Sequence, residues 1–201
     1  MFSRFISILL VVAFICGLYS CASIPEERKG VATGAGVGAA TGAVAGGLIG
    51  GSTRSTIIGG LLGGLAGGAI GHYGYDQRRS GTETAQAYNY QPASGTVLKI
   101  EDASIAPTSV QPGQKVDLKM TYAVLNPTQN QQVNVTETRE IRFGDQVVGK
   151  PQVNVARTAG TYTSTVPLTL PQNAQKGTYT VVSTVQAGGV TDTRQTNFNV
   201  G

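Results

Sequence analysis

Glycine recurs at every fourth position through most of residues 30–75, and this spacing limits what the segment can fold into. Two ladders carry it, Gly34, Gly38, Gly42, Gly46 and Gly50 in the first and Gly59, Gly63, Gly67 and Gly71 in the second. Each glycine costs a helix in water about 1 kcal/mol relative to alanine. In lipid the balance reverses, because a helix satisfies every backbone N–H and C=O internally. A glycine on every turn also leaves a bare groove into which a second helix packs closely.

The length of the segment predicts a helical hairpin across a membrane. No charged residue occurs from Gly30 to Thr53, and the polar stretch Ser52–Thr56 separates the two ladders. About 22 residues in a helix span roughly 33 Å, close to the roughly 30 Å of a hydrocarbon core. Tyr73 and Tyr75 are expected at the membrane interface, where aromatic rings are favoured. The spans are only weakly apolar, so we expect homo-oligomers that pack through the glycine hairpins. The hairpin lying against the membrane, without crossing it, stays open as an alternative.

The first 20 residues have the pattern of a secretory signal peptide. Arg4 precedes an apolar run from Phe5 to Leu18, which is too short for a comfortable transmembrane helix. The run ends in Leu18-Tyr19-Ser20-Cys21, which resembles the bacterial lipobox. We therefore expect cleavage before Cys21, with a diacylglycerol group on its sulfur and an N-acyl chain on its amine. Two acyl chains already anchor a protein stably.

Other readings of the N-terminus are weaker. Cys16 is a rival for the lipidated position, but the large Ile15 before it suits cleavage poorly. An ordinary secreted protein in which Cys21 is incidental is the second alternative. If Cys21 is lipidated as expected, residues 21–29 form a lipidated segment ahead of the hairpin.

These features together resemble the glycine-zipper two-transmembrane lipoproteins, the SlyB and 17 kDa surface antigen group. The resemblance rests on Cys21, the Gly34–Gly50 ladder, the Ser52–Thr56 break and the Gly59–Gly71 ladder, and it covers about residues 18–75. It implies a lipoprotein of the outer membrane of a diderm bacterium, linked to envelope integrity or surface display, with no catalytic residues. Ala22 after the lipidated cysteine, where aspartate would favour the inner membrane, agrees with that location.

The chain changes character after residue 75. Residues 76–95 are polar and are expected to be a linker, and residues 96–201 follow a period of two. Between Lys115 and Leu125, apolar and polar side chains alternate as in a half-buried strand. Turn residues divide the module into about seven expected strands, at 97–105, 115–125, 132–143, 146–156, 161–170, 177–187 and 190–200.

This spacing predicts an all-β, immunoglobulin-like sandwich, with Tyr179 as a candidate corner tyrosine. The expected fold class is thus α + β in separate parts: a glycine-zipper helical membrane hairpin followed by the sandwich.

The module offers little chemistry. The whole chain has one His and two Cys, which leaves few ways to build a metal site or a Cys/His pair. Glu137, Arg139, Glu140 and Arg142 make a mixed-charge strand, which we expect to be a solvated face, with a partner-docking strip as the alternative. We expect no catalytic residues, no metal and no cofactor beyond the acyl chains. The net charge of +4 is spread along the chain, so we expect no nucleic-acid binding.

The sequence therefore predicts a structural or interaction lipoprotein rather than an enzyme. The acyl chains and hairpin would hold it in membrane lipid, and the sandwich would face the periplasm and bind an envelope protein. An oligomeric pore or membrane-perturbing protein is the alternative, although no ring of charge lines the spans. A hydrolase acting on wall polymers would need paired carboxylates or an activated nucleophile, and no such pair stands out.

Overall fold

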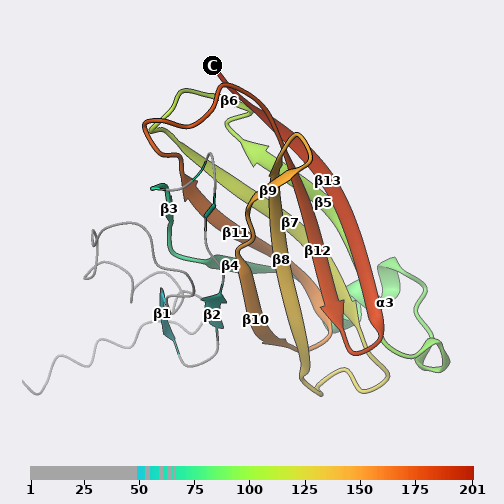
Figure 1. The fold of residues 1–201 in the computed structure, drawn as a ribbon. Helices are drawn as coiled ribbons and strands as arrows, with labels where there is room; N and C mark the ends of the chain where they lie inside the picture. The colour runs from blue at the N-terminus through green and yellow to red at the C-terminus, as the bar shows by residue number, and fades with distance from the viewer. Residues whose placement is uncertain (1–48, 53–54, 59–60, 63–64, 66) are drawn as a thin grey trace, which may run out of the picture.

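Two β-sheets pack face to face in the computed structural model, which describes residues 49–52, 55–58, 61–62, 65 and 67–201 (Figure 1). The larger sheet has the order β1 (Ile49–Ser52), β2 (Ser55–Ile58), β10 (Gln152–Arg157), β8 (Val133–Phe143), β12 (Gly177–Ala187), β13 (Val190–Val200) and β6 (Ser109–Val110), with β9 (Gln146–Gly149) on β8. The smaller sheet has the order β3 (Ala69–Ile70), β11 (Gly160–Thr169), β7 (Lys115–Leu125) and β5 (Val97–Ala106), with β4 (Gly74–Ser80) on β11. The expected β-sandwich is confirmed.

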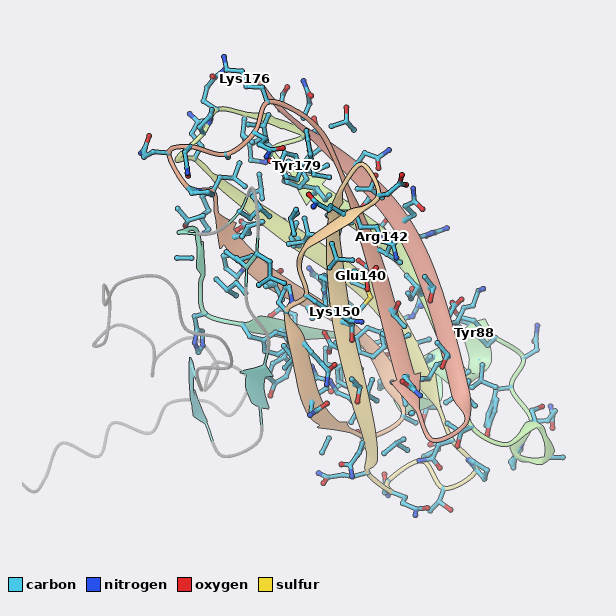
Figure 2. The ribbon with its side chains drawn as sticks, viewed as in Figure 1. Tyr88, Glu140, Arg142, Lys150, Lys176 and Tyr179 are labelled. Carbon is cyan, nitrogen blue, oxygen red and sulfur yellow. The ribbon has the colours of Figure 1, made fainter. Side chains whose placement is uncertain are left out.

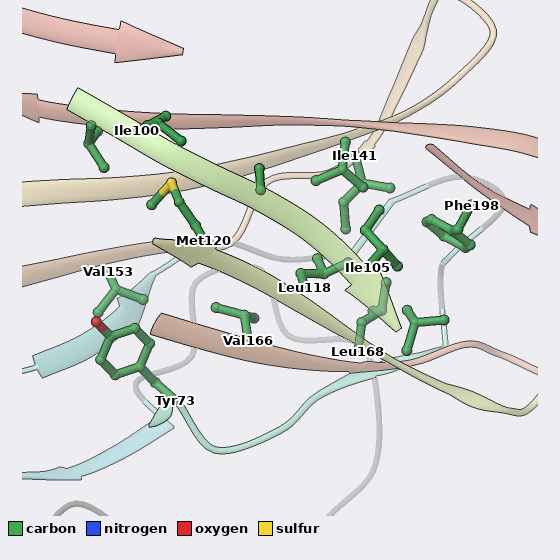
Figure 3. Packing of buried hydrophobic residues seen from close by; sticks show 14 of the residues in the cluster. Tyr73, Ile100, Ile105, Leu118, Met120, Ile141, Val153, Val166, Leu168 and Phe198 are labelled. Atoms are coloured by element: carbon green, nitrogen blue, oxygen red, sulfur yellow. The ribbon is translucent and has the colours of Figure 1, made fainter. Parts of the chain in front are cut away.

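The core follows the predicted period of two. In β7 the side chains of Val116, Leu118, Met120 and Tyr122 point inward and are at most 1% exposed. They pack against inward residues of the other sheet, among them Ile141 (Figure 3). Full burial of one such aliphatic side chain stabilises a fold by roughly 1.5–3 kcal/mol.

The strands lie close to the predicted ranges, with one division. The range 146–156 holds two strands, β9 and β10, because the chain is interrupted at Lys150-Pro151. Proline has no N–H to donate to a strand partner. The carbonyl of Pro151 instead accepts a hydrogen bond of 2.9 Å from the N–H of Arg139.

Tyr179 occupies the predicted corner. It begins the inward face of β12, and its hydroxyl donates to the carbonyl of Gln175 at 2.9 Å. Its ring stacks on Phe198 of β13, with ring centres 5.1 Å apart. The hydroxyl thus ties the loop before β12 to the core.

Residues 76–95 differ from the expected linker, because most of them are folded onto the sandwich. Gly74–Ser80 forms β4, an edge strand paired with β11. Helix α3 (Gly81–Ala87) follows at once, and η3 (Pro92–Ser94) is a short 3-10 helix. Ser80 and Glu83 form a capping box: the Ser80 hydroxyl accepts from the Glu83 N–H, and a Glu83 oxygen accepts from the Ser80 N–H. These two hydrogen bonds fix the start of helix α3 at Ser80.

Several of the described residues of 49–75 form short strands, and none of them forms the predicted α-helix. Segments β1 and β2 pair with each other, β2 extends the larger sheet along β10, and β3 pairs with β11. Tyr73 is a further correction: it was expected at a membrane interface, yet it is buried in the core at 5% exposure (Figure 3). Among the described residues, no helix is both long and apolar enough to cross a membrane.

Side chains of β13 close the free edge of β5. The carboxylate of Asp192 accepts a hydrogen bond of 2.7 Å from the N–H of Ile100. The guanidinium of Arg194 donates to the carbonyl of Glu101. Unpaired groups on an edge strand are a template for pairing with another chain. In this structure the N–H of Ile100 and the carbonyl of Glu101 already have side-chain partners and are not open to another chain.

Candidate functional site

The glycine-rich segment meets the sandwich at a buried cluster of charged and phenolic side chains. We call it the junction cluster; its members are Tyr73, Tyr122, Glu137, Arg139, Arg157 and Ser164. They come from the end of the glycine-rich segment and from four strands of both sheets, β7, β8, β10 and β11. Each is at most 5% exposed. The cluster therefore joins the two predicted parts of the chain inside one core.

Glu137 is the centre of the junction cluster, and both of its oxygens are saturated. Its Oε1 accepts from the hydroxyls of Tyr73 at 2.7 Å and Tyr122 at 2.6 Å. Its Oε2 accepts from Arg139 Nη1 at 2.9 Å and from Ser164 Oγ at 2.6 Å. A buried carboxylate is tolerated only when it is paired and hydrogen-bonded in this way.

Arg157 holds the other side of the cluster. Its Nη2 donates to the Tyr73 hydroxyl at 2.7 Å, and its Nε donates to the Tyr122 hydroxyl at 3.1 Å. The guanidinium carbon also lies 4.2 Å from the centre of the Tyr75 ring and 4.7 Å from that of Tyr162. Such cation–π contacts favour a desolvated guanidinium. Tyr73 thus bonds to a cation and an anion at once.

The surroundings keep Glu137 charged and the two phenols neutral. Burial alone would raise the pKa of Glu137, but the charges of Arg139 and Arg157 outweigh it, so its pKa lies below the usual value. Burial, together with the charge of Glu137, raises the pKa of Tyr73 and Tyr122 well above the usual value. The cluster therefore carries a fixed carboxylate rather than a group tuned to exchange protons near neutrality.

The cluster corrects the expected solvated strand. Within β8, Glu137 and Arg139 share the inward face with Val135 and Ile141, while Glu140 and Arg142 face outward. Figure 2 shows that outward pair beside Lys150, and Glu140 forms ion pairs with both cations. The burial of Glu137 and Arg139 could have been predicted, because they lie an even number of positions from the apolar Val135 and Ile141 and so share their face of the strand. Sequence reasoning treated all four charges as one surface and missed it.

An open polar groove lies on the outer face of the smaller sheet. It has a volume of about 420 Å³ and is lined by side chains that include Arg78, Arg79, Glu101, Lys119 and Thr163. Arg79 is ion-paired with Glu101, and Arg78 Nε donates to Thr163 Oγ1 at 3.2 Å. Cations and hydroxyls of this kind suit polar contacts with a ligand.

The predicted site residues fall in different parts of the chain. The lipidation site Cys21 lies outside the described residues, as do Gly34, Gly38, Gly42, Gly46, Gly59 and Gly63. Gly50 lies in β1, Gly67 in a turn with a φ of +90°, and Gly71 beside Pro167 of β11. Helix packing by the ladders stays a prediction. Within the part of the chain that the structure describes, no group of three potential metal ligands comes together.

Family models match two regions of the chain. A model described as a YMGG-like Gly-zipper matches residues 1–75, and a model of the Countin C-terminal domain matches residues 98–200. The first match points to a membrane-associated protein. The boundary between the two falls within residues 76–97, ahead of or at the start of β5. No curated protein matches the chain.

Several solved structures are weakly similar to part of this chain. The β-glucosidase EmGH1 of Erythrobacter marinus is 8% identical over 53% of this chain and 16% of its own, with a TM-score of 0.40. Spo0M, a sporulation control protein of Bacillus subtilis, is 15% identical over 51% of this chain and 49% of its own, with a TM-score of 0.36. A conjugative transposon lipoprotein of Bacteroides eggerthii is 9% identical over 54% and 98%, with a TM-score of 0.30. This chain spans 16–31% of the first matched structures, and likenesses this weak carry no argument about activity.

Proposed function

The chain belongs to the Countin C-terminal domain family through residues 98–200. With that domain as the module and the YMGG-like Gly-zipper region as the anchor, we propose that it is a membrane-anchored lipoprotein which holds an interaction module at the cell envelope. The anchor is the acylated Cys21 together with the glycine-zipper segment of residues 30–75. The module is the sandwich, which we interpret as immunoglobulin-like and which faces the periplasm from the outer membrane. The role is structural, contributes to envelope integrity and involves no catalysis.

One observation carries this proposal: Tyr73, at the end of the glycine-rich segment, is bonded into the core of the sandwich. Its hydroxyl donates to Glu137 and accepts from Arg157. The four-residue spacing of the segment favours packing in lipid. A segment that prefers lipid and ends inside a folded core fixes that core close to the membrane surface. A fixed link between the membrane segment and the sandwich suits a protein that holds a binding surface at a defined distance from the membrane.

The outer faces of the two sheets supply the surfaces for a partner. The smaller sheet presents the polar groove with Arg78 and Lys119. The larger sheet presents a second shallow polar surface, which includes Asn134, Thr136 and Asn154. Both surfaces offer polar side chains beside apolar ones, so an envelope protein bound there would be held by hydrogen bonds and charges together with apolar contacts.

Acyl labelling in cells tests the anchor. The wild type, Cys21→Ala and Cys16→Ala are grown with radiolabelled palmitate, and their membranes are separated by density. We expect label in the outer membrane for the wild type and for Cys16→Ala, and none for Cys21→Ala. Cys16→Ala is the matched control because it removes the only other thiol of the chain. Label that survives Cys21→Ala would reject the anchor.

Photo-crosslinking from the full chain tests the module. A photoreactive residue is placed at Lys119 on the smaller sheet or at Asn154 on the larger one, since both are exposed. We expect one envelope protein to be captured from one of the two faces. Capture of no protein from either face would leave the anchor intact but reject the binding role.

A further inference from the structure

The described part of the second glycine ladder lies along an edge of the sandwich. Strand β3 pairs with β11, with Ile70 opposite Leu168 and Ala69 opposite Thr169. Further along, the N–H of Gly71 donates to the carbonyl of Pro167 at 2.7 Å. The ladder's backbone is therefore paired with the sandwich at its end nearest Tyr73.

The other end of the ladder touches the second sheet. Leu61 forms an antiparallel bridge with Gly149 of β9, and the N–H of Leu62 donates to the carbonyl of Val148 at 2.6 Å. Leu65 is fully buried in the common core. Leu65 is thus covered by the sandwich and Leu61 packs partly against it, whereas the side chain of Leu62 stays 58% exposed.

Glycine makes the close approach to β11 possible. A Cβ added at Gly68 would lie 2.6 Å from the carbonyl oxygen of Thr169, a contact that real side chains do not make. A Cβ at Gly71 would lie 3.1 Å from the side chain of Pro167. Gly67 has a φ of +90°, which other residues rarely adopt. Gly67 and Gly71 of the second ladder, together with the adjacent Gly68, therefore fit the edge of the sandwich.

The same residues cannot form this edge contact and a membrane helix at once. A helix bonds each N–H to the carbonyl four residues before it, whereas here the N–H groups of Leu62 and Gly71 bond to Val148 and Pro167. We propose that the edge of the sandwich formed by β9 and β11 is a docking surface for the described residues of the second ladder region in its own chain, Leu61, Leu62, Leu65 and residues 67–71. It keeps the second ladder out of lipid until the segment inserts, and Tyr73 stays bonded to the junction cluster as the fixed end.

A disulfide across the edge tests the docking. This inference rests on the proposed function, because it assumes that the ladder enters lipid. Ala69 and Thr169 face each other across β3 and β11 and are both exposed, so Ala69→Cys with Thr169→Cys locks the ladder in place. The matched control is Thr184→Cys with Thr193→Cys, because these residues face each other across β12 and β13, away from the ladder. Both pairs are made with Cys16→Ser, which leaves Cys21 for acylation.

The readout is contact of the ladder with lipid. The full acylated chain is mixed with phospholipid vesicles whose acyl chains carry a photoreactive group, and labelled residues are located by mass spectrometry. We expect label on Leu61 and Leu65 in the wild type and in the control pair. The oxidised lock loses this label, and reduction restores it.

A glycine substitution shifts the balance in the opposite direction. Gly68→Ala clashes with the Thr169 carbonyl in the docked form, whereas alanine is small enough for a membrane helix pair and favours helix. We expect more label on Leu61 and Leu65 than in the wild type. Gly74→Ala is the control, since nothing lies within 4 Å of its added Cβ.

Equal label in the oxidised and reduced lock would overturn the docking inference alone. So would equal label in Gly68→Ala and the wild type. If the wild type shows no label in the ladder, whether or not it binds the vesicles, the proposed insertion of the zipper is overturned, and the docking inference falls with it.

Discussion

The hydroxyl of Tyr73 lies 2.7 Å from Oε1 of Glu137, although 64 positions separate the two residues in the chain. Tyr73 belongs to the glycine-rich segment, and Glu137 belongs to a central strand of the larger sheet. The bond therefore ties the segment predicted to contact the membrane to the strand at the centre of the module.

Removing the Tyr73 hydroxyl should destabilise the sandwich. In Tyr73→Phe, Glu137 loses one donor and Arg157 loses one acceptor, and both stay buried. We expect a loss of about 1–3 kcal/mol in the free energy of unfolding, measured by denaturant titration. Tyr75→Phe is the control, since Tyr75 is 48% exposed, and it should change the value by less than about 0.5 kcal/mol. Similar losses in the two variants would contradict the tie.

Replacing each of two arginines on β8 should destabilise the fold by very different amounts. Arg139 is buried and bonded to Glu137 and Ser164, whereas Arg142 faces solvent and pairs with Glu140. Arg139→Leu leaves a buried carboxylate short of a partner, so we expect a loss of about 3–5 kcal/mol. Arg142→Leu should cost at most about 1 kcal/mol. Thermal unfolding of both variants measures the difference, and equal shifts would show that Glu137 does not depend on Arg139.

The charge of Glu137 should make the fold sensitive to acid. Its pKa is lower in the folded state than its ordinary value of 4.5, so the unfolded chain binds the proton more readily. The stability due to this shift is present above pH 4.5 and is lost as the pH falls through the folded pKa. Glu137→Gln should therefore lower stability at pH 7 and flatten its dependence on pH below 4.5. An unchanged acid slope in that variant would assign the sensitivity to other carboxylates.

Opening the edge of β5 should promote association between chains. Asp192→Ala leaves the N–H of Ile100 without its acceptor and removes the ion pair with Lys99. We expect dimers or larger species whose fraction rises with protein concentration in sedimentation experiments, because exposed edge groups pair with other chains. The control is Thr193→Ala, at the adjacent, outward-facing position of β13, which should associate no more than the wild type. An Asp192→Ala variant that associates no more than the wild type would mean that the edge is protected by other contacts.

The sandwich was predictable because most of its strands bury one face and expose the other. The alternation from Val116 to Val124 places β7 correctly, and turn residues separate it from its neighbours. Strand β4 was missed because it is an edge strand whose residues are mostly exposed, so its pattern looks like a polar linker. Ser80 and Glu83, a serine followed three residues later by glutamate, cap the start of α3, although this stretch was predicted to be a linker.

The junction cluster was less predictable for a physical reason. A charged residue on an inward position is unfavourable unless partners from elsewhere in the chain neutralise it. The partners of Glu137 include Tyr73 and Ser164, which lie 64 and 27 positions away. Only the assembled sheets bring them together, so parity within β8 could suggest the burial but not its compensation. The burial of Tyr73 has the same origin.

The most direct test of the whole account is flotation of the full, acylated chain with phospholipid vesicles, followed by extraction at high salt and at alkaline pH. The account predicts that the wild type floats and resists extraction, because acyl chains on Cys21 and the glycine segment both hold it. Cys21→Ala, which removes the acyl chains, should be extracted more readily than the wild type. A wild type that stays at the bottom of the gradient, with its sandwich folded, would contradict the claim that the glycine-rich segment places this module at a membrane.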